Sequence, residues 1–264
     1  TPLLAISVHL WGWRWGAAMA GMAFLLIGLP LCLTIRNSPE SMGLHPDGET
    51  DLVAAPGDKQ SHRPAVAEGE VTASQAIRSF AFWALVFGAA VRNAAYHAIA
   101  THFIPLMVWK GMSQQEAALM LSAFAFLGFA STLIFGWLAD SMNKPRLVSS
   151  ILFTAGVSIC FLIFGDSILP LGIFILLFTT VEATYPVAWA MVGDIFGRKH
   201  FAKIRGYMSV FYVWGSVTGP VIAGAVWDRW ESYEPMLWGL VLMFFLSGAF
   251  YTLLGKPWSR PKNT

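Results

Sequence analysis

One charged side chain lies inside a stretch of sequence that is otherwise suited to cross a membrane. Arg92 is near the middle of the apolar run from Phe80 to Trp109. An arginine at the centre of a membrane helix costs roughly 2.5 to 3.5 kcal/mol on insertion scales. We therefore expect Arg92 to face a protein interior or an aqueous cavity and to bind a ligand. A purely structural charge pair is the alternative.

Three further polar side chains follow Arg92 on the same helix. Asn93, Tyr96 and His97 come one, four and five residues later, which places them on one side. They predict a continuous polar stripe that would line a binding site. For His97, a neutral packing role and a binding role remain equally open. We expect no metal site, because His97 and His102 are five residues apart and no carboxylate shares their run.

A second polar face occurs in the apolar run 168–192. Glu182, Tyr185 and Trp189 follow one another at helical spacing, and Pro186 interrupts the helix hydrogen bonds. Helix rise places Arg92 about 18 Å and Glu182 about 15 Å from the same ends of their runs. We predict an Arg92–Glu182 pair at a substrate site, with Trp189 in contact with substrate. The alternatives are a structural pair, or a Glu182 that hydrogen-bonds elsewhere.

The elements that must position these residues are membrane helices. With 56% hydrophobic and 12% charged residues, the chain has the composition of a polytopic membrane protein. A first apolar run covers Trp15–Ile35, and residues 36–76 read as a polar linker rich in turn residues. Six apolar runs follow, at about 80–109, 117–138, 147–164, 168–192, 207–227 and 236–254.

The positive charges of the loops predict the orientation. Lys and Arg gather in the linker and in every second loop after it, whereas the opposite loops hold only Arg14, Lys110 and Arg229. Cytoplasmic loops collect such residues. We therefore expect an integral protein of the plasma (inner) membrane whose linker and C-terminus are cytoplasmic.

Several segments resemble the major facilitator superfamily. They read GWLADSMNKPR (136–146), RNSPESMGLHPDG (36–48), HFIPLMVWKGMSQQEAA (102–118) and GDIFGRKHFAKIRGYMSVFYVWGSVTGPVIAGAVWDRWESY (193–233). The last is similar to the monocarboxylate-porter and oxalate–formate antiporter branch. The resemblance implies an all-α fold of two six-span halves around a midplane site.

That fold would divide the chain into three parts. Residues 1–35 would be the tail of span five and span six, 36–76 the cytoplasmic central linker, and 77–264 the C-terminal six-span half with a cytoplasmic tail. The N-terminal half would be missing and would supply the other wall of the site. Spans seven and ten, which carry Arg92 and Glu182, both line the central cavity in that family.

The resemblance also points to residues that change position during transport. Asp140, Lys144 and Arg146 would form a cytoplasmic latch, for which a solvated turn is the alternative. Asp194 and Arg198 lie in the longest matching segment and are also expected to have a gating or conformational role. His102 matches the outer end of the seventh span and could help to gate the site. Gly219 and Pro220 could form a hinge. Gly215, Gly219 and Gly224 also share one helix face, so static close packing is the favoured alternative.

The leading functional hypothesis is secondary active transport of a small organic anion, most simply a monocarboxylate, by proton symport or anion exchange. The planar fork of Arg92 matches a carboxylate, and an incoming anion would displace Glu182, which would then take a proton. The alternatives are an exporter of amphipathic cationic or neutral compounds and a transporter-like membrane sensor. We expect no enzyme activity, no cofactor beyond a coupling proton, and no partner beyond the anion, the lipid bilayer and the missing half; nucleic acid is not expected.

Overall fold

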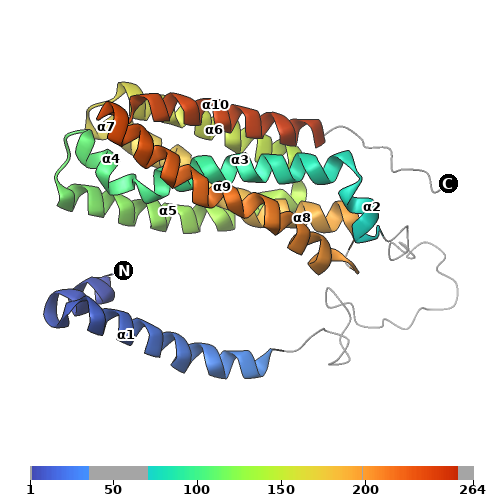
Figure 1. Cartoon of the computed structure of the whole chain (residues 1–264), viewed down its shortest axis with the longest axis horizontal. Coiled ribbons are helices and arrows are strands. Elements are labelled where there is room, and N and C mark those ends of the chain that lie inside the picture. The colour runs from blue at the N-terminus through green and yellow to red at the C-terminus, as the bar shows by residue number, and fades with distance from the viewer. Residues whose placement is uncertain (1, 36–70, 198, 255–264) are drawn as a thin grey trace, which may run out of the picture. The chain divides into compact units, whose positions relative to one another are not determined.

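The computed structural model describes residues 2–35, 71–197 and 199–254, which form helices joined by short connections (Figure 1). The chain divides into two compact units, residues 1–67 and 68–264. Each unit is described by itself. The all-helical fold expected from the sequence is confirmed.

The first unit contains helix α1, Pro2–Thr34. Gly12 interrupts it with φ 80° and ψ 163°, a backbone conformation that glycine adopts without a steric penalty. The stretch Trp11–Thr34 after this interruption is long and apolar enough to cross a membrane, and it contains most of the predicted first span. The predicted linker between 36 and 70 lies outside the described residues.

The second unit holds the remaining helices. They are α2 (Ala73–Ile77), α3 (Phe80–Thr101), α4 (Phe103–Trp109), α5 (Gln114–Ser141), α6 (Lys144–Phe164), α7 (Ile168–Phe178), the 3₁₀ helix η3 (Thr179–Ala183), α8 (Thr184–Phe196), α9 (Phe201–Trp230) and α10 (Glu234–Leu254). Helix α2 corrects the end of the predicted linker. Thr72 and Gln75 cap each other's backbone there and start a short helix before the first span of this unit.

The predicted single span 80–109 is two helices, α3 and α4, that meet at His102. Pro105 explains the interruption. Its ring lacks an N–H and crowds the carbonyl four residues earlier, at Thr101. His102 accordingly leaves the helical conformation, with φ −94° and ψ 14°.

The predicted span 168–192 is also interrupted, at the level of Glu182. Helices α7 and α8 are joined by η3 rather than by continuous α-helix. Pro186 has no N–H to donate to the carbonyl of Glu182, so the regular ladder is lost at this turn. This change of backbone shapes the site described below.

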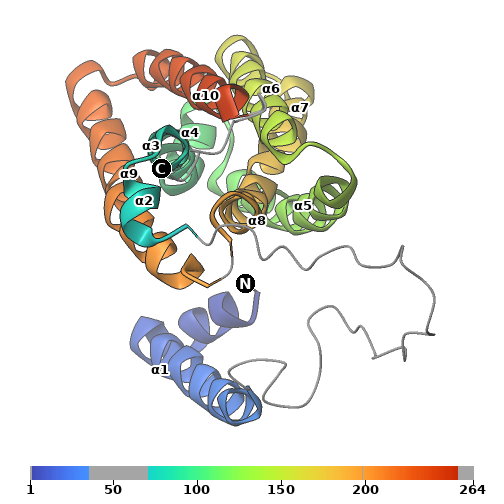
Figure 2. The ribbon, with the colours of Figure 1, turned by 90° about the vertical axis from the view of Figure 1, so that its right-hand side faces the viewer.

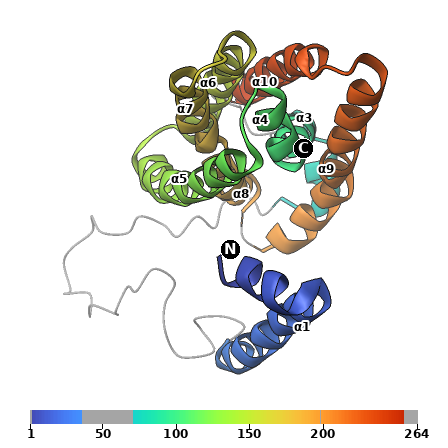
Figure 3. The same cartoon turned by 90° about the vertical axis from the view of Figure 1, so that its left-hand side faces the viewer.

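Within the described residues, six helical stretches are long and apolar enough to cross a membrane: Trp11–Thr34, Gln114–Ser141, Lys144–Phe164, Ile168–Phe196, Phe201–Trp230 and Glu234–Leu254. Helix α3 is not among them, since Arg92, Asn93 and His97 lower its mean hydropathy. It lies in the middle of its unit with α9 and α10 beside it (Figures 2 and 3). The polar helix is thus sheltered by apolar ones.

Two glycines bring α9 directly onto the backbone of α3. A Cβ atom added at Gly215 would lie 2.2 Å from the carbonyl oxygen of Ala90, and one at Gly219 would lie 2.1 Å from that of Ala94. At Gly224 the nearest atom, of His102, would be 3.8 Å away, which is ordinary contact. The predicted close approach is confirmed at Gly215 and Gly219.

Replacing Gly219 by alanine should therefore destabilise the protein, because the new methyl group forces α9 away from α3. We expect a loss of about 1 to 3 kcal/mol, the usual cost of overpacking. The measurement is the thermal unfolding midpoint of the full-length protein in detergent. Gly224→Ala is the matched control and should leave the midpoint unchanged; equal midpoints for the two variants would contradict the packing described here.

Candidate functional site

The guanidinium group of Arg92 is buried, with 7% of the residue exposed, and is held by three hydrogen bonds. Its Nε donates to the hydroxyl of Thr184 at 3.0 Å, Nη1 to the side-chain oxygen of Asn93 at 2.8 Å, and Nη2 to the carbonyl oxygen of Val181 at 2.8 Å. All three acceptors are neutral. The positive charge is therefore solvated by protein dipoles and is not neutralised by them.

The η3 turn supplies one of these acceptors. The carbonyl oxygen of Val181 accepts from Arg92 and also from the hydroxyl of Thr184, at 2.6 Å. The same carbonyl accepts the backbone N–H of Thr184, three residues on, as in a 3₁₀ turn. Arg92 thus shares this backbone partner with the turn, at the depth that helix rise predicts.

Glu182 does not pair with Arg92, and the predicted ion pair is wrong for this conformation. Its Oε1 accepts a hydrogen bond from the hydroxyl of Tyr96. Its Cγ lies 3.1 Å from the position of a Cβ atom built on Gly128, so α5 packs directly behind it. Tyr96 stands between the two charges, since the guanidinium carbon of Arg92 is 4.9 Å from the centre of its ring.

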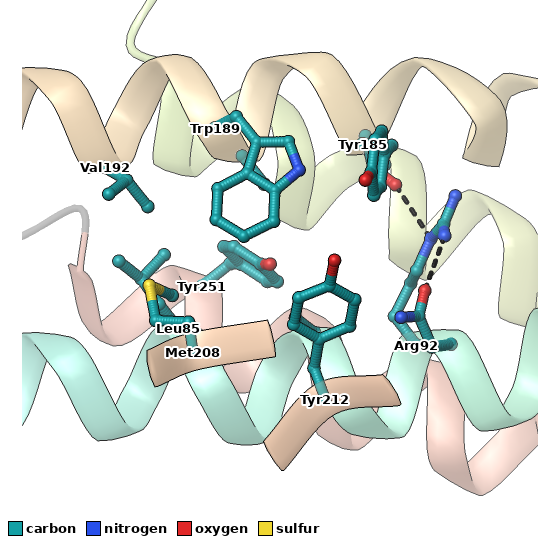
Figure 4. Close-up of a pocket in the computed structure, with 12 residues that line it drawn as sticks. Leu85, Arg92, Tyr185, Trp189, Val192, Met208, Tyr212 and Tyr251 are labelled. Carbon is teal, nitrogen blue, oxygen red and sulfur yellow. Dashed lines mark hydrogen bonds between the residues drawn. The ribbon is translucent and has the colours of Figure 1, made fainter. Parts of the chain in front are cut away.

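A small pocket opens beside Arg92, between α3, α8, α9 and α10 (Figure 4). Its volume is about 30 Å³, enough for about two water molecules. Arg92 lies at one end and Val192 and Met208 at the other, with aromatic rings between them. The lining residues are Leu85, Ala89, Arg92, Asn93, Thr184, Tyr185, Ala188, Trp189, Val192, Met208, Tyr212 and Tyr251.

The residues predicted to form the site fall into two groups. Arg92, Asn93, Tyr185 and Trp189 line the pocket. Tyr96, His97 and Glu182 do not, and they gather on the other side of Arg92. His97 is half-buried there, with its ring edge-on to that of Tyr96 at 5.2 Å. The expected continuous stripe is therefore two adjacent polar groups that share Arg92.

Sequence reasoning missed the contribution of Thr184, Tyr212 and Tyr251. Thr184 was visible as a polar neighbour of the Glu182 face, but its bond to Arg92 depends on the η3 turn. Tyr212 and Tyr251 are isolated tyrosines in apolar runs. A hydroxyl in such a run was the available signal, and a single hydroxyl among apolar residues is a weak one.

The pocket also contains a polar atom without a partner. The indole N–H of Trp189 is buried and makes no hydrogen bond within the described part of the chain. Its ring nitrogen points along the pocket toward the end that holds Tyr185 and Arg92 (Figure 4). A buried donor of this kind costs about 1 to 3 kcal/mol when it stays unpaired, so it is suited to a ligand acceptor.

At the predicted cytoplasmic latch, the acidic residue that pairs with Lys144 is Asp194 and not Asp140. Lys144, at the start of α6, forms an ion pair of 2.8 Å with Asp194 of α8. Asp140 is exposed and makes no ion pair with a described residue. The backbone N–H of Arg146 donates to Asn143, which caps α6, while its side chain is exposed. Arg198 lies outside the described residues.

At the opposite end of the bundle, His102 joins three elements. Its Nε2 is 3.2 Å from the carbonyl oxygen of Pro220, and its Nδ1 is 3.1 Å from the hydroxyl of Tyr233. A carbonyl only accepts, so Nε2 carries the proton. Burial raises the pKa of Tyr233, as does the nearby Asp228, and the hydroxyl stays a donor to Nδ1. Helix α9 runs through Gly219 and Pro220 without interruption, and a hinge there stays a prediction.

Comparison with known proteins supports the reading of the fold. The Membrane sensor protein UhpC of Salmonella typhimurium is 24% identical over 164 residues, which is 59% of this chain and 35% of the relative. The protein of the same name from Escherichia coli is 24% identical over 164 residues, 59% of this chain and 36% of the relative. The chain thus spans about a third of the length of these curated relatives.

The family model of the Major Facilitator Superfamily matches residues 1–183 and 110–264. The two overlapping matches together cover the whole chain. Six apolar helical stretches, the buried cation among them and the extent of this match lead to one conclusion: the chain is an integral membrane protein and belongs to the major facilitator superfamily.

Proposed function

We propose that the full-length protein is a secondary active transporter of a small organic anion, a monocarboxylate. The observation that carries the proposal is the buried guanidinium of Arg92, which lines a pocket and, within the described part of the chain, hydrogen-bonds to neutral groups alone. A buried charge that makes no direct ion pair is costly, and Glu182 interacts with Arg92 only across the Tyr96 ring. An anion in the pocket would remove that cost, and this gives the site its affinity.

The donors around the pocket fit one carboxylate. Arg92 uses three of its N–H groups on the protein, and a guanidinium has five. The remaining two and the indole N–H of Trp189 are available to carboxylate oxygens. Among the described residues that line the pocket, Arg92 supplies the positive charge alone. A monoanion with a small apolar substituent matches this charge and the aromatic walls.

The resemblance of 193–233 to the monocarboxylate-porter branch supports the same substrate class. In this proposal the proton has a separate place, the hydrogen-bonded pair of Tyr96 and Glu182. Glu182 would carry the proton while the anion is bound to Arg92. Anion and proton would then cross the membrane together. If Glu182 carried no proton, the protein would instead exchange one anion for another.

A transporter-like sensor is the second candidate, and the name of both relatives, membrane sensor protein, favours it. A sensor would bind the same anion at Arg92 without moving it. Accumulation of solute inside sealed vesicles separates the two functions. The orientation, with the linker and C-terminus in the cytoplasm of a plasma (inner) membrane, is part of the proposal and rests on the loop charges.

The substitution Arg92→Gln should abolish carboxylate uptake. Proteoliposomes of the full-length protein would be tested with labelled monocarboxylates, dicarboxylates and a lipophilic cation. Loss of hydrogen bonds to a charged group costs about 1.5 to 3 kcal/mol, so uptake should fall at least about tenfold. Arg229→Gln, at an exposed position of α9, is the control. Carboxylate uptake equal in the two variants would make Arg92 structural, and uptake of the cation alone would favour the exporter.

Glu182→Gln should separate coupling from recognition. The amide cannot take up and release a proton, so stimulation of uptake by an inward proton gradient should disappear while exchange of internal for external anion continues. The measurement compares both modes in the same vesicles. If the gradient still drives accumulation in the variant, Glu182 is not the proton site.

The ion pair between Lys144 and Asp194 should act as a latch on the cycle. Lys144→Asp and Asp194→Lys each place like charges together and should slow transport, whereas the double variant should recover. Because both residues are partly exposed, the effect should be modest, about 0.2 to 1 kcal/mol. Turnover rate is the readout, and Arg146→Asp provides a control for surface charge. A double variant no faster than the single ones would show that the pair has no such role.

A further inference from the structure

Arg205 lies just beyond the pocket and continues one of its walls. On α9, Arg205, Met208 and Tyr212 follow at spacings of three and four residues, so they share one face. Met208 and Tyr212 line the pocket. The guanidinium carbon of Arg205 is 4.6 Å from the centre of the Trp189 ring, which is a cation–π distance. A second cation therefore meets the site from α9.

The guanidinium of Arg205 has N–H donors to spare, since it carries five of them. It is exposed and makes no ion pair with any residue in the described ranges, where the hydroxyl of Tyr185 is the polar group within its reach. Stacking on an indole holds the guanidinium plane while leaving its N–H edge open, so less freedom is lost when an anion binds. Arg92 differs in each respect, since it is buried and three of its N–H groups are already used.

An aromatic cluster connects the two cations. The ring of Trp189 contacts that of Tyr185 at 6.0 Å and that of Tyr212 at 5.6 Å. Thr184, which is bonded to Arg92, precedes Trp189 by five residues of α8, or about 7 to 8 Å of helix rise. Trp189 thus contacts Arg205 and directs its unpaired N–H along the pocket toward Arg92 (Figure 4).

We propose that Arg205 and Trp189 form a second anion-binding position at the mouth of the pocket, where a carboxylate is held between the aqueous phase and Arg92. This proposal rests on the anion-transport function but concerns a different set of residues. The position is more exposed than Arg92 and binds more weakly. An entering anion therefore binds weakly at Arg205 and Trp189 before it reaches Arg92, and it can leave by the same route.

Binding at this position can be measured without transport. The full-length protein in detergent is titrated with acetate, and the fluorescence contributed by Trp189 is obtained by subtracting the Trp189→Phe variant. We expect a saturable change whose apparent affinity falls about tenfold or more in Arg205→Gln, as for loss of a hydrogen bond to a charged group. Chloride at the same ionic strength controls for screening.

Three variants make the result decisive. Lys203→Gln removes an exposed positive charge from the same turn of α9 and should leave the titration unchanged. Arg205→Lys keeps the charge without the planar fork and should weaken binding less than Arg205→Gln. Arg92→Gln should keep the Trp189 signal, because that signal reports the mouth position. A titration insensitive to Arg205→Gln, or one equally weakened by Lys203→Gln, overturns the proposal.

Uptake kinetics distinguish failure of this proposal from failure of the transport function. In proteoliposomes, Arg205→Gln should raise KM for the monocarboxylate that the wild type accumulates and leave kcat close to that of wild type. Arg92→Gln should remove uptake. If wild type transports no carboxylate while the acetate titration still depends on Arg205, the mouth position stands and the transport proposal falls. If Arg92→Gln changes both assays and Arg205→Gln changes neither, the transport proposal stands and the mouth position falls.

Discussion

The hydrogen bonds of the buried Arg92 are the constraint on which this unit depends. A guanidinium in the middle of a helical bundle must be surrounded by oxygen atoms, and a regular helix has few to spare. The chain meets the requirement with an interrupted helix, in which Val181 of η3 presents its carbonyl and Thr184, the first residue of α8, presents its hydroxyl.

In the proposed function, the two polar groups around Arg92 would keep anion binding and proton transfer apart. Asn93, Tyr185 and Trp189 face the pocket, whereas Tyr96 and Glu182 bond to each other behind it. A carboxylate that formed a tight ion pair with Arg92 would compete with any anionic ligand for the same donors. The separation leaves those donors open, and the Tyr96 ring still places Arg92 and Glu182 close enough to influence each other.

The sequence was informative where periodicity and side-chain chemistry decide the outcome. The helices, the polar face around Arg92 and the close approach at Gly215 and Gly219 follow from spacing and residue size. The direction of Glu182 does not, because it lies on a 3₁₀ turn where helical periodicity no longer tells which way a side chain points. The contact between Arg205 and Trp189 was also missed, since a cation near the end of a span reads as a loop charge that only sets orientation.

The glycine contacts of α9 have a mechanical consequence. Gly215 and Gly219 press α9 against the backbone of α3 at Ala90 and Ala94, on either side of Arg92. Two helices in such close contact would move together as one rigid lever. Sliding would then occur along the surface between this lever and α8, which is crossed by the Arg92–Thr184 bond and by the Arg205–Trp189 stack. Arg92 and Arg205 would then move together relative to α8, and their contacts with Thr184 and Trp189 would break and re-form.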